Sequence, residues 1–204
     1  VQSSNKKTLK SVNRSENIEE LKKNIMRIPE TIHTHLDLIA GLPYEDFESF
    51  GKSFDFVIQM APDALQLGFL KVLHGSPILE YCKKNGWQWM KTPPYEVFST
   101  PYLSYSEIGI LKNIEILTDV FWNSGHFYFL MNYMLKNSSL WNLFVEMEKI
   151  FSKNSVFSEA HKEIFWFEQT ALLCRQSFFS KFNLNSEILY ELLRFDFIRS
   201  GKKG

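Results

Sequence analysis

Apolar residues in the first third of the chain follow two different spacings. Short, nearly continuous apolar runs at residues 36–42 and 64–70 are each bounded by turn residues. Such runs are typical of strands that are covered on both faces of a parallel sheet. Between them, residues 47–60 carry apolar side chains at helical spacing. The order strand, helix, strand with short connections predicts a βα repeat whose two strands are parallel neighbours.

The remaining pattern is helical. Ser15 can cap a helix over residues 16–27, which Pro29 ends. Ser104 and Glu107 have the spacing of a capping box. An irregular, proline-rich and tryptophan-rich segment is predicted over residues 86–102. Further helices are predicted at 78–85, 106–122, 127–135, 140–151, 159–179 and 186–197. We therefore expect an α/β part over residues 1–75, a mainly α-helical domain over 76–200, and a solvated tail over 201–204.

The first predicted strand carries a carboxylate. Alternation along a strand places Asp37 and Ile39 on one face with His33 and His35, and leaves a purely apolar opposite face. A carboxylate within a buried strand is unfavourable unless something binds it, so Asp37 is a candidate ligand-binding residue. The structural alternative is that it accepts backbone N–H groups of a neighbouring turn.

Composition narrows the function classes. Lys plus Arg and Asp plus Glu both number 23, so the net charge is zero and favours neither nucleic acid nor an anionic membrane. No apolar run approaches the roughly 18 residues of a membrane span. Cys82 and Cys174 form no motif, and we expect a reduced, cytoplasmic protein. The 19 phenylalanines predict an aromatic core for the helical domain, with a pocket for a flat substrate as the alternative.

The chain begins at Val1 rather than Met. Two strands do not make a stable sheet alone. We therefore expect a fragment of a longer protein whose other strands complete the sheet. An exposed sheet edge that pairs between two copies as a homodimer is the further expectation.

Several segments, in order, resemble one family. Residues 35–46, HLDLIAGLPYED, resemble the fifth-strand motif of the radical S-adenosylmethionine enzymes. Residues 1–14 resemble the turn and helix after the fourth strand, and residues 65–75, LQLGFLKVLHG, resemble the sixth strand of one subgroup. That subgroup has an N-terminal cobalamin-binding domain, the radical barrel and a C-terminal helical domain, which PPYEV at 93–97 and NSG at 123–125 also resemble. Its members are described as iron–sulfur oxidoreductases or likened to the Mg-protoporphyrin IX monomethyl ester cyclase.

The resemblance implies a fold and a set of site residues. The fold is the last βα units of a partial TIM-like radical S-adenosylmethionine barrel followed by a mainly helical domain. The implied cofactor-binding residues are Gln2, Arg14, Asp37, Ile39, Gly41 and Leu70.

Each of these residues has an implied role. Gln2 matches a turn residue near S-adenosylmethionine, and Arg14 matches the arginine for its carboxylate. Asp37 matches a carboxylate that accepts from ribose hydroxyls. Ile39 and Leu70 match apolar contacts to adenine. Gly41 lets the backbone pass close to the ligand.

Simpler interpretations stand beside two of these assignments. Gln2 is otherwise a loose chain end, and Arg14 is otherwise a surface residue paired with Glu16 or Glu19. A glutamate usual in the family falls at Glu45, one place later than in some members.

The resemblance also implies what the chain needs from elsewhere. S-adenosylmethionine, a [4Fe–4S] cluster and cobalamin belong to the parent protein. Cys82 and Cys174 cannot supply the family's Cys-x-x-x-Cys-x-x-Cys loop. The chain alone is therefore expected to bind none of the three and to have no radical chemistry. Its expected partners are the rest of the parent chain and a small-molecule substrate, without nucleic acid or membrane.

Two other functions remain open from the residues. The helical part is alternatively a protein-interaction or scaffold module without catalysis. His33 and His35 are alternatively the start of a His-x-His metal-dependent hydrolase site. Their position before the apolar run argues against a metal site, because sites in such barrels lie at the C-terminal ends of strands. We assign no metal ligand.

Overall fold

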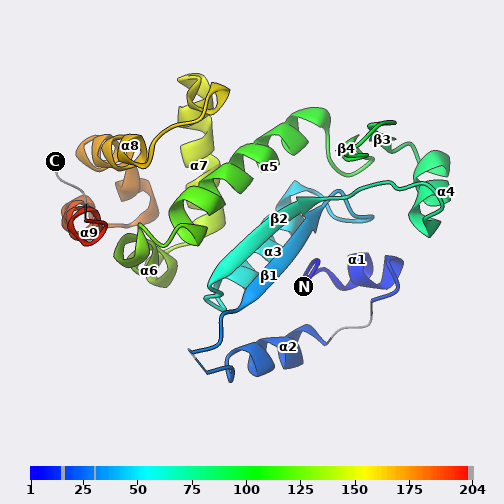
Figure 1. Cartoon of the computed structure of the whole chain (residues 1–204), viewed down its shortest axis with the longest axis horizontal. Helices are drawn as coiled ribbons and strands as arrows, with labels where there is room; N and C mark the ends of the chain where they lie inside the picture. Colours follow the sequence, from blue (N-terminus) through cyan, green and yellow to red (C-terminus); the bar gives the residue numbers. More distant parts are fainter. Residues whose placement is uncertain (15–16, 30, 202–204) are drawn as a thin grey trace. The chain divides into compact units, whose positions relative to one another are not determined.

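The computed structural model of the chain describes residues 1–14, 17–29 and 31–201. The chain is rich in α-helix, as the sequence predicts, and separates into two compact units, Val1–Lys112 and Asn113–Gly204 (Figure 1). The division falls within α5 (Tyr105–Thr118), so residues 76–112 belong to the unit that contains the sheet. Apart from Gly201, the predicted tail lies outside the described residues.

The predicted βα repeat is confirmed in the first unit. β1 (His35–Ala40) and β2 (Ala64–Phe69) are parallel neighbours, with Asp37 opposite Gln66 and Ile39 opposite Gly68. α3 (Phe47–Ile58) connects them and contacts β1. The buried side of the sheet and the buried side of α3 form the core of this unit, through Leu36, Leu38, Leu65, Leu67, Phe50, Phe54 and Val57.

Two short helices precede the sheet. α1 (Lys6–Ser11) begins after Asn5, whose side chain accepts hydrogen bonds from the N–H groups of Lys7 and Thr8. α2 (Ile18–Ile25) begins after Asn17, whose side chain accepts from the N–H of Glu20. The predicted cap, Ser15, lies outside the described residues, and the observed cap stands two positions later. Asparagine fits this position because its carbonyl oxygen reaches an unpaired N–H of the first turn.

The irregular segment predicted over residues 86–102 contains a small antiparallel pair, β3 (Gln88–Trp89) and β4 (Val97–Ser99), after α4 (Pro77–Lys84). The backbone of this segment forms hydrogen bonds with the residues that follow β2. The N–H of Val97 donates to the carbonyl oxygen of Leu70 at 3.0 Å, and that of Val72 donates to Tyr95 at 2.9 Å. Strands of two and three residues are too short to show an alternating pattern, so the sequence does not predict them.

The second unit is a helical assembly around aromatic side chains, as the phenylalanine content predicts. It contains the π-helical turn η1 (Asp119–Asn123), α6 (Tyr128–Asn137), α7 (Leu140–Lys153), α8 (Glu163–Arg175) and α9 (Ser186–Arg199). The rings of Phe127 and Phe167 stack at 4.3 Å, and Phe121 lies 4.7 Å from Phe127. α9 contacts both α6 and α8.

The capping box at the start of α5 is confirmed. The N–H of Ser104 donates to Glu107 Oε2 at 2.8 Å, and the N–H of Glu107 donates to Ser104 Oγ at 3.3 Å. None of the described helices combines the length and the apolar character that crossing a membrane requires.

Candidate cofactor-binding face of the sheet

The two faces of the β1–β2 sheet differ in chemistry. Leu36, Leu38 and Ala40 are buried on the face toward α3, whereas Asp37 is exposed and Ile39 half-buried on the other. The cross-strand neighbours continue this contrast, because Gln66 is exposed and Gly68 has no side chain. A Cβ at Gly68 would meet only the carbonyl oxygen of Leu38, at 3.6 Å. The open face therefore carries a carboxylate, an amide and an apolar group with free space beside them.

The expectation that Asp37 is buried is wrong for the described chain. The alternation that places Asp37 opposite the apolar face is correct, but no second layer among the described residues covers its side chain. The unfavourable burial of a lone carboxylate therefore does not apply to Asp37. Asp37 remains a candidate ligand-binding residue because of its position: it projects from the open face, two residues before Ile39.

Gln2 is not a loose end. Its carbonyl oxygen accepts a hydrogen bond from the N–H of Ile39 at 3.0 Å. Successive residues of a strand direct their backbone groups to opposite edges, and the carbonyl oxygen of Ala40, the next residue, accepts from the N–H of Leu70 on the β2 side. The segment at Gln2 thus lies along the other edge of β1, near the N label in Figure 1. The structure brings Gln2, Asp37 and Ile39 together.

Arg14 follows α1 and is exposed. Its backbone N–H donates to the carbonyl oxygen of Leu9 at 2.9 Å, which closes the turn after the helix. Of its two proposed surface partners, Glu16 lies outside the described residues and Glu19 is exposed on α2.

Gly41 lies where the backbone approaches another segment closely. It is buried at φ +88°, and an added Cβ would lie 2.5 Å from Val97 Cγ2. Its carbonyl oxygen accepts from Trp87 Nε1 at 3.1 Å. Glycine at this position thus permits a close approach to Val97, and the role of Gly41 beside a ligand stays a prediction. Leu70 is half-buried at the same end of the sheet, 3.6 Å from the position of that Cβ.

Aromatic side chains from separate segments gather at this C-terminal end. The ring of Tyr102 lies 5.4 Å from Tyr44 and 5.8 Å from Trp87, and Tyr81 lies 5.2 Å from Trp87. Tyr44 has φ +64°, an uncommon conformation for a bulky residue. Burial raises the pKa of Tyr81 to about 12. The sequence does not predict this cluster, because its members come from three distant segments.

The buried residue that the sequence left without a clear role is Glu45. Its side chain is fully buried and accepts from Ser3 Oγ at 2.5 Å and from Ser53 Oγ at 2.9 Å. Its Oε2 has no hydrogen-bond partner among the described residues. Burial is the main cause that raises its pKa to about 7, and the hydroxyls of Ser3 and Ser53 oppose that rise. Glu45 therefore anchors the N-terminal segment.

His33 and His35 adjoin one another at the opposite end of β1. Their Nε2 atoms are 3.0 Å apart, and His33 Nδ1 lies 3.8 Å from Asp63 Oδ2. Within the described parts of the chain, no group of three or more His, Cys, Asp or Glu side chains is arranged to hold a metal ion. This pair lies at the N-terminal end of β1, whose first residue is His35, away from the C-terminal end where ligand sites of parallel sheets form.

Both cysteines are poor iron ligands as placed. Cys82 and Cys174 are buried and unbonded to each other. Burial raises the pKa of Cys82 to about 11 and that of Cys174 to about 12. Both thiols lie in the interior, and two of them fall short of the three closely spaced thiolates that a [4Fe–4S] cluster with one open iron requires.

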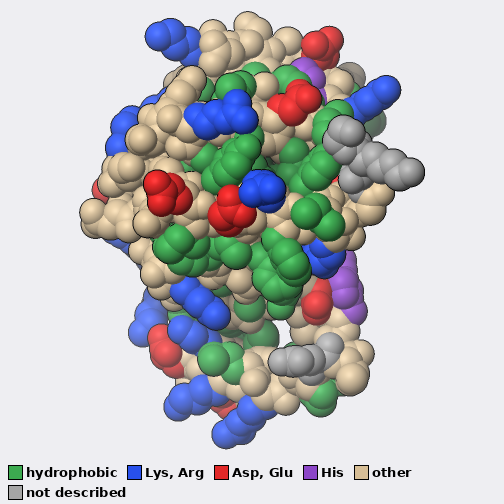
Figure 2. Space-filling view, turned by 90° about the vertical axis from the view of Figure 1, so that its left-hand side faces the viewer, with side chains coloured by type: hydrophobic (Ala, Val, Ile, Leu, Met, Phe, Trp, Pro, Cys, Tyr) green, Lys and Arg blue, Asp and Glu red, His purple; other side chains and the backbone are tan. Residues whose placement is uncertain are grey.

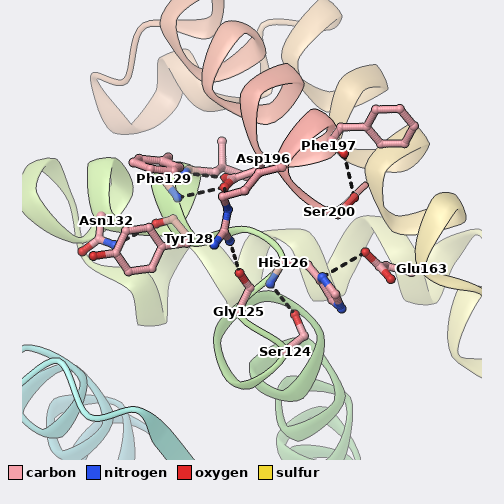
Figure 3. Close-up of polar contacts among 12 residues, drawn as sticks. Ser124, Gly125, His126, Tyr128, Phe129, Asn132, Glu163, Asp196, Phe197 and Ser200 are labelled. Carbon is pink, nitrogen blue, oxygen red and sulfur yellow. Dashed lines mark hydrogen bonds and ion pairs between the residues drawn. The ribbon is translucent and has the colours of Figure 1, made fainter. Parts of the chain in front are cut away.

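The second unit has its own buried carboxylate, which the sequence does not predict. Asp196 of α9 accepts from the N–H groups of Phe129 and Leu130 at 3.1 and 3.0 Å, in the first turn of α6 (Figure 3). Burial raises its pKa, and these two N–H groups oppose the rise. Arg199, 3.7 Å from Asp196, donates to the carbonyl oxygen of Gly125. Both carboxylate oxygens are engaged, so Asp196 clamps two helices together rather than presenting a site.

The comparisons with known proteins give one family. Residues 83–204, more than half of the chain, match the family described as "Protein of unknown function (DUF4080)". A comparison with curated proteins finds no match.

We expect Gly41→Ala to destabilise the first unit by about 1–3 kcal/mol more than Gly75→Ala does, because overpacking is added to backbone strain. Both glycines have positive φ, but a Cβ at Gly75 meets no atom within 4 Å. Urea unfolding of the two variants measures the difference. Equal losses would show that Val97 yields without strain.

We expect the stability of the wild-type chain to fall as pH rises from about 5 to about 8, by up to about 3 kcal/mol. The folded state keeps the Glu45 proton to a pKa of about 7, whereas the unfolded state releases it near 4.5, so deprotonation favours unfolding. Glu45→Gln removes this slope, and Glu48→Gln, at an exposed position of α3, retains it. Unfolding midpoints across this pH range test the prediction, and identical slopes in all three proteins would contradict it.

Asp196→Ala should destabilise the second unit by about 2–4 kcal/mol, because two buried N–H groups lose their acceptor. Asp196→Asn keeps one acceptor and should recover part of the loss. Glu191→Ala removes an exposed ion pair to Arg194 and should cost under about 1 kcal/mol. Chemical unfolding followed by helical circular dichroism compares the three. A loss no greater than that of Glu191→Ala would contradict the clamp.

Proposed function

The chain belongs to the DUF4080 family, and from that premise we propose that it is the C-terminal portion of a cobalamin-dependent radical S-adenosylmethionine protein. In this proposal the open face of the β1–β2 sheet forms one wall of the S-adenosylmethionine site. The observation that carries it is the grouping of Asp37, Ile39 and Gly68 on one open face, beside the anchored segment at Gln2.

The residues of this face fit the cofactor by chemistry. The exposed carboxylate of Asp37 is an acceptor for hydroxyl donors such as those of a ribose. Ile39 offers a half-buried apolar surface, and the missing side chain at Gly68 leaves a flat ring access to it. When S-adenosylmethionine is bound at a [4Fe–4S] cluster, the pair supplies reductive radical chemistry. Cys82 and Cys174, two buried thiols far apart in sequence, do not make up the three closely spaced ligands of the cluster, so in this proposal the ligands come from other residues of the parent protein.

The family region supports a covering role at the C-terminal end of β1. Trp87 and Val97 both belong to the matched residues, and both lie against Gly41. The first part of the family region therefore closes the end of the strand on which the proposed site lies. We extend this to the helical part, which in the proposal shapes the cavity for a small-molecule substrate, tetrapyrrole-like by the resemblance.

The test is ligand binding by the full-length natural protein with its cluster in place. Asp37→Ala should raise the Kd for S-adenosylmethionine by roughly 10–100-fold, the effect of losing about 1.5–3 kcal/mol of hydrogen bonding. Glu48→Ala removes an exposed carboxylate from α3 and should leave the Kd unchanged. Calorimetric titration gives both values. Equal affinities in the two variants would contradict a role for Asp37.

A sequence observation tests the parent protein separately. The natural gene upstream of the codon for Val1 should encode a Cys-x-x-x-Cys-x-x-Cys loop, because three closely spaced thiolates leave one iron open. The absence of this loop would contradict the proposal, whatever the chain binds.

A further inference from the structure

A groove of about 380 Å³ runs between α8 and α9 in the second unit. α8 contributes Ile164, Glu168 and Ala171 to its walls, and α9 contributes Arg194, Phe197 and Ile198. The α8 positions are spaced i, i+4, i+7 and the α9 positions i, i+3, i+4, which is the stripe that one helix presents to another. Figure 2 shows hydrophobic side chains gathered among charged ones on this face of the molecule.

Both helices are apolar on two sides. Trp166 and Leu173 bury the inner side of α8, and Leu189 buries that of α9. On the groove side, Ile164 is 37% exposed and Ile198 69% exposed. A helix with apolar residues around most of its circumference is normally covered on both sides. The groove therefore has the character of a surface that packs against further helices.

The charges of the groove identify the partner. Glu168 comes from α8 and Arg194 from α9, so the groove carries one charge of each sign on its two walls. A surface with both signs is complementary to itself when two copies meet about a two-fold axis. A second copy offers each of these charges an opposite one across the interface, while Arg194 keeps its contact with Glu191 of its own copy.

We propose that the α8–α9 groove binds the same groove of a second copy of this chain. The two helix pairs then form a four-helix bundle in which Glu168 of each copy faces Arg194 of the other. Within one copy Arg194 Nη1 already lies 3.0 Å from Glu191, so the interface joins these charges into a network. This dimer uses a helical surface rather than an edge of the sheet, and it does not rest on the proposed cofactor site.

The full chain, purified, should sediment as a dimer. Ile198→Arg places a charge in the apolar wall and should raise the dimer dissociation constant by about tenfold or more. Ile116→Arg is the matched control, since Ile116 is 39% exposed on α5 and does not line the groove. Analytical ultracentrifugation over a concentration series measures both. A monomer at every concentration, or equal weakening by the two variants, would overturn the proposal.

A charge exchange tests the pairing itself. Glu168→Arg and Arg194→Glu should each weaken self-association, because like charges then face one another. An equimolar mixture of the two variants should regain a dimer that contains one copy of each. Circular dichroism confirms that both remain folded. A mixture as monomeric as its components would overturn the pairing of Glu168 with Arg194, and a self-association that neither change affects would place the interface elsewhere.

Discussion

The first unit depends on one buried carboxyl group. Glu45 receives hydroxyl donors from Ser3 at the chain's start and from Ser53 on α3, so it ties together segments that are far apart in sequence. This contact holds the N-terminal segment in place, and Gln2 can then accept a hydrogen bond from Ile39. The edge of β1 is covered by the backbone at Gln2 because the side chain of Glu45 anchors the next residue, Ser3.

This anchor is unfavourable for stability in two respects. Burial raises the pKa of the Glu45 carboxyl group to about 7. Its deprotonation as the pH rises therefore favours the unfolded state. Its unpartnered oxygen adds to that disadvantage among the described residues. The fold tolerates both because the serine hydroxyls fix a segment that carries few apolar contacts of its own. The Glu45 contacts thus fix the segment whose backbone lies along the edge of β1.

The sequence predicts the local elements well and the long-range contacts poorly. The parallel pairing of β1 and β2 and the cap at Ser104 both follow from short-range patterns, and both are confirmed. The burial of Asp37 was wrong because alternation tells which side chains share a face but not whether a layer covers that face. The contact of Gly41 with Val97 could not be predicted, because Val97 is 56 positions away and no local pattern connects the two residues. The clamp at Asp196 was missed for the same reason, since its carboxylate accepts from the N–H of Leu130, 66 residues earlier in the chain.

Two surfaces of this chain lack a cover among the described residues, and their chemistry separates them. The open face of the sheet mixes Asp37 and Gln66 with Ile39, so water solvates much of it at little cost and a polar ligand can replace that water. The α8–α9 groove instead exposes Ile164 and Ile198, whose hydration is unfavourable in proportion to their apolar area. Burial of the first surface by protein would gain little free energy, whereas a small molecule that forms hydrogen bonds can bind it favourably. The second gains chiefly by excluding water from apolar area, which a complementary helical surface does more completely than a small ligand.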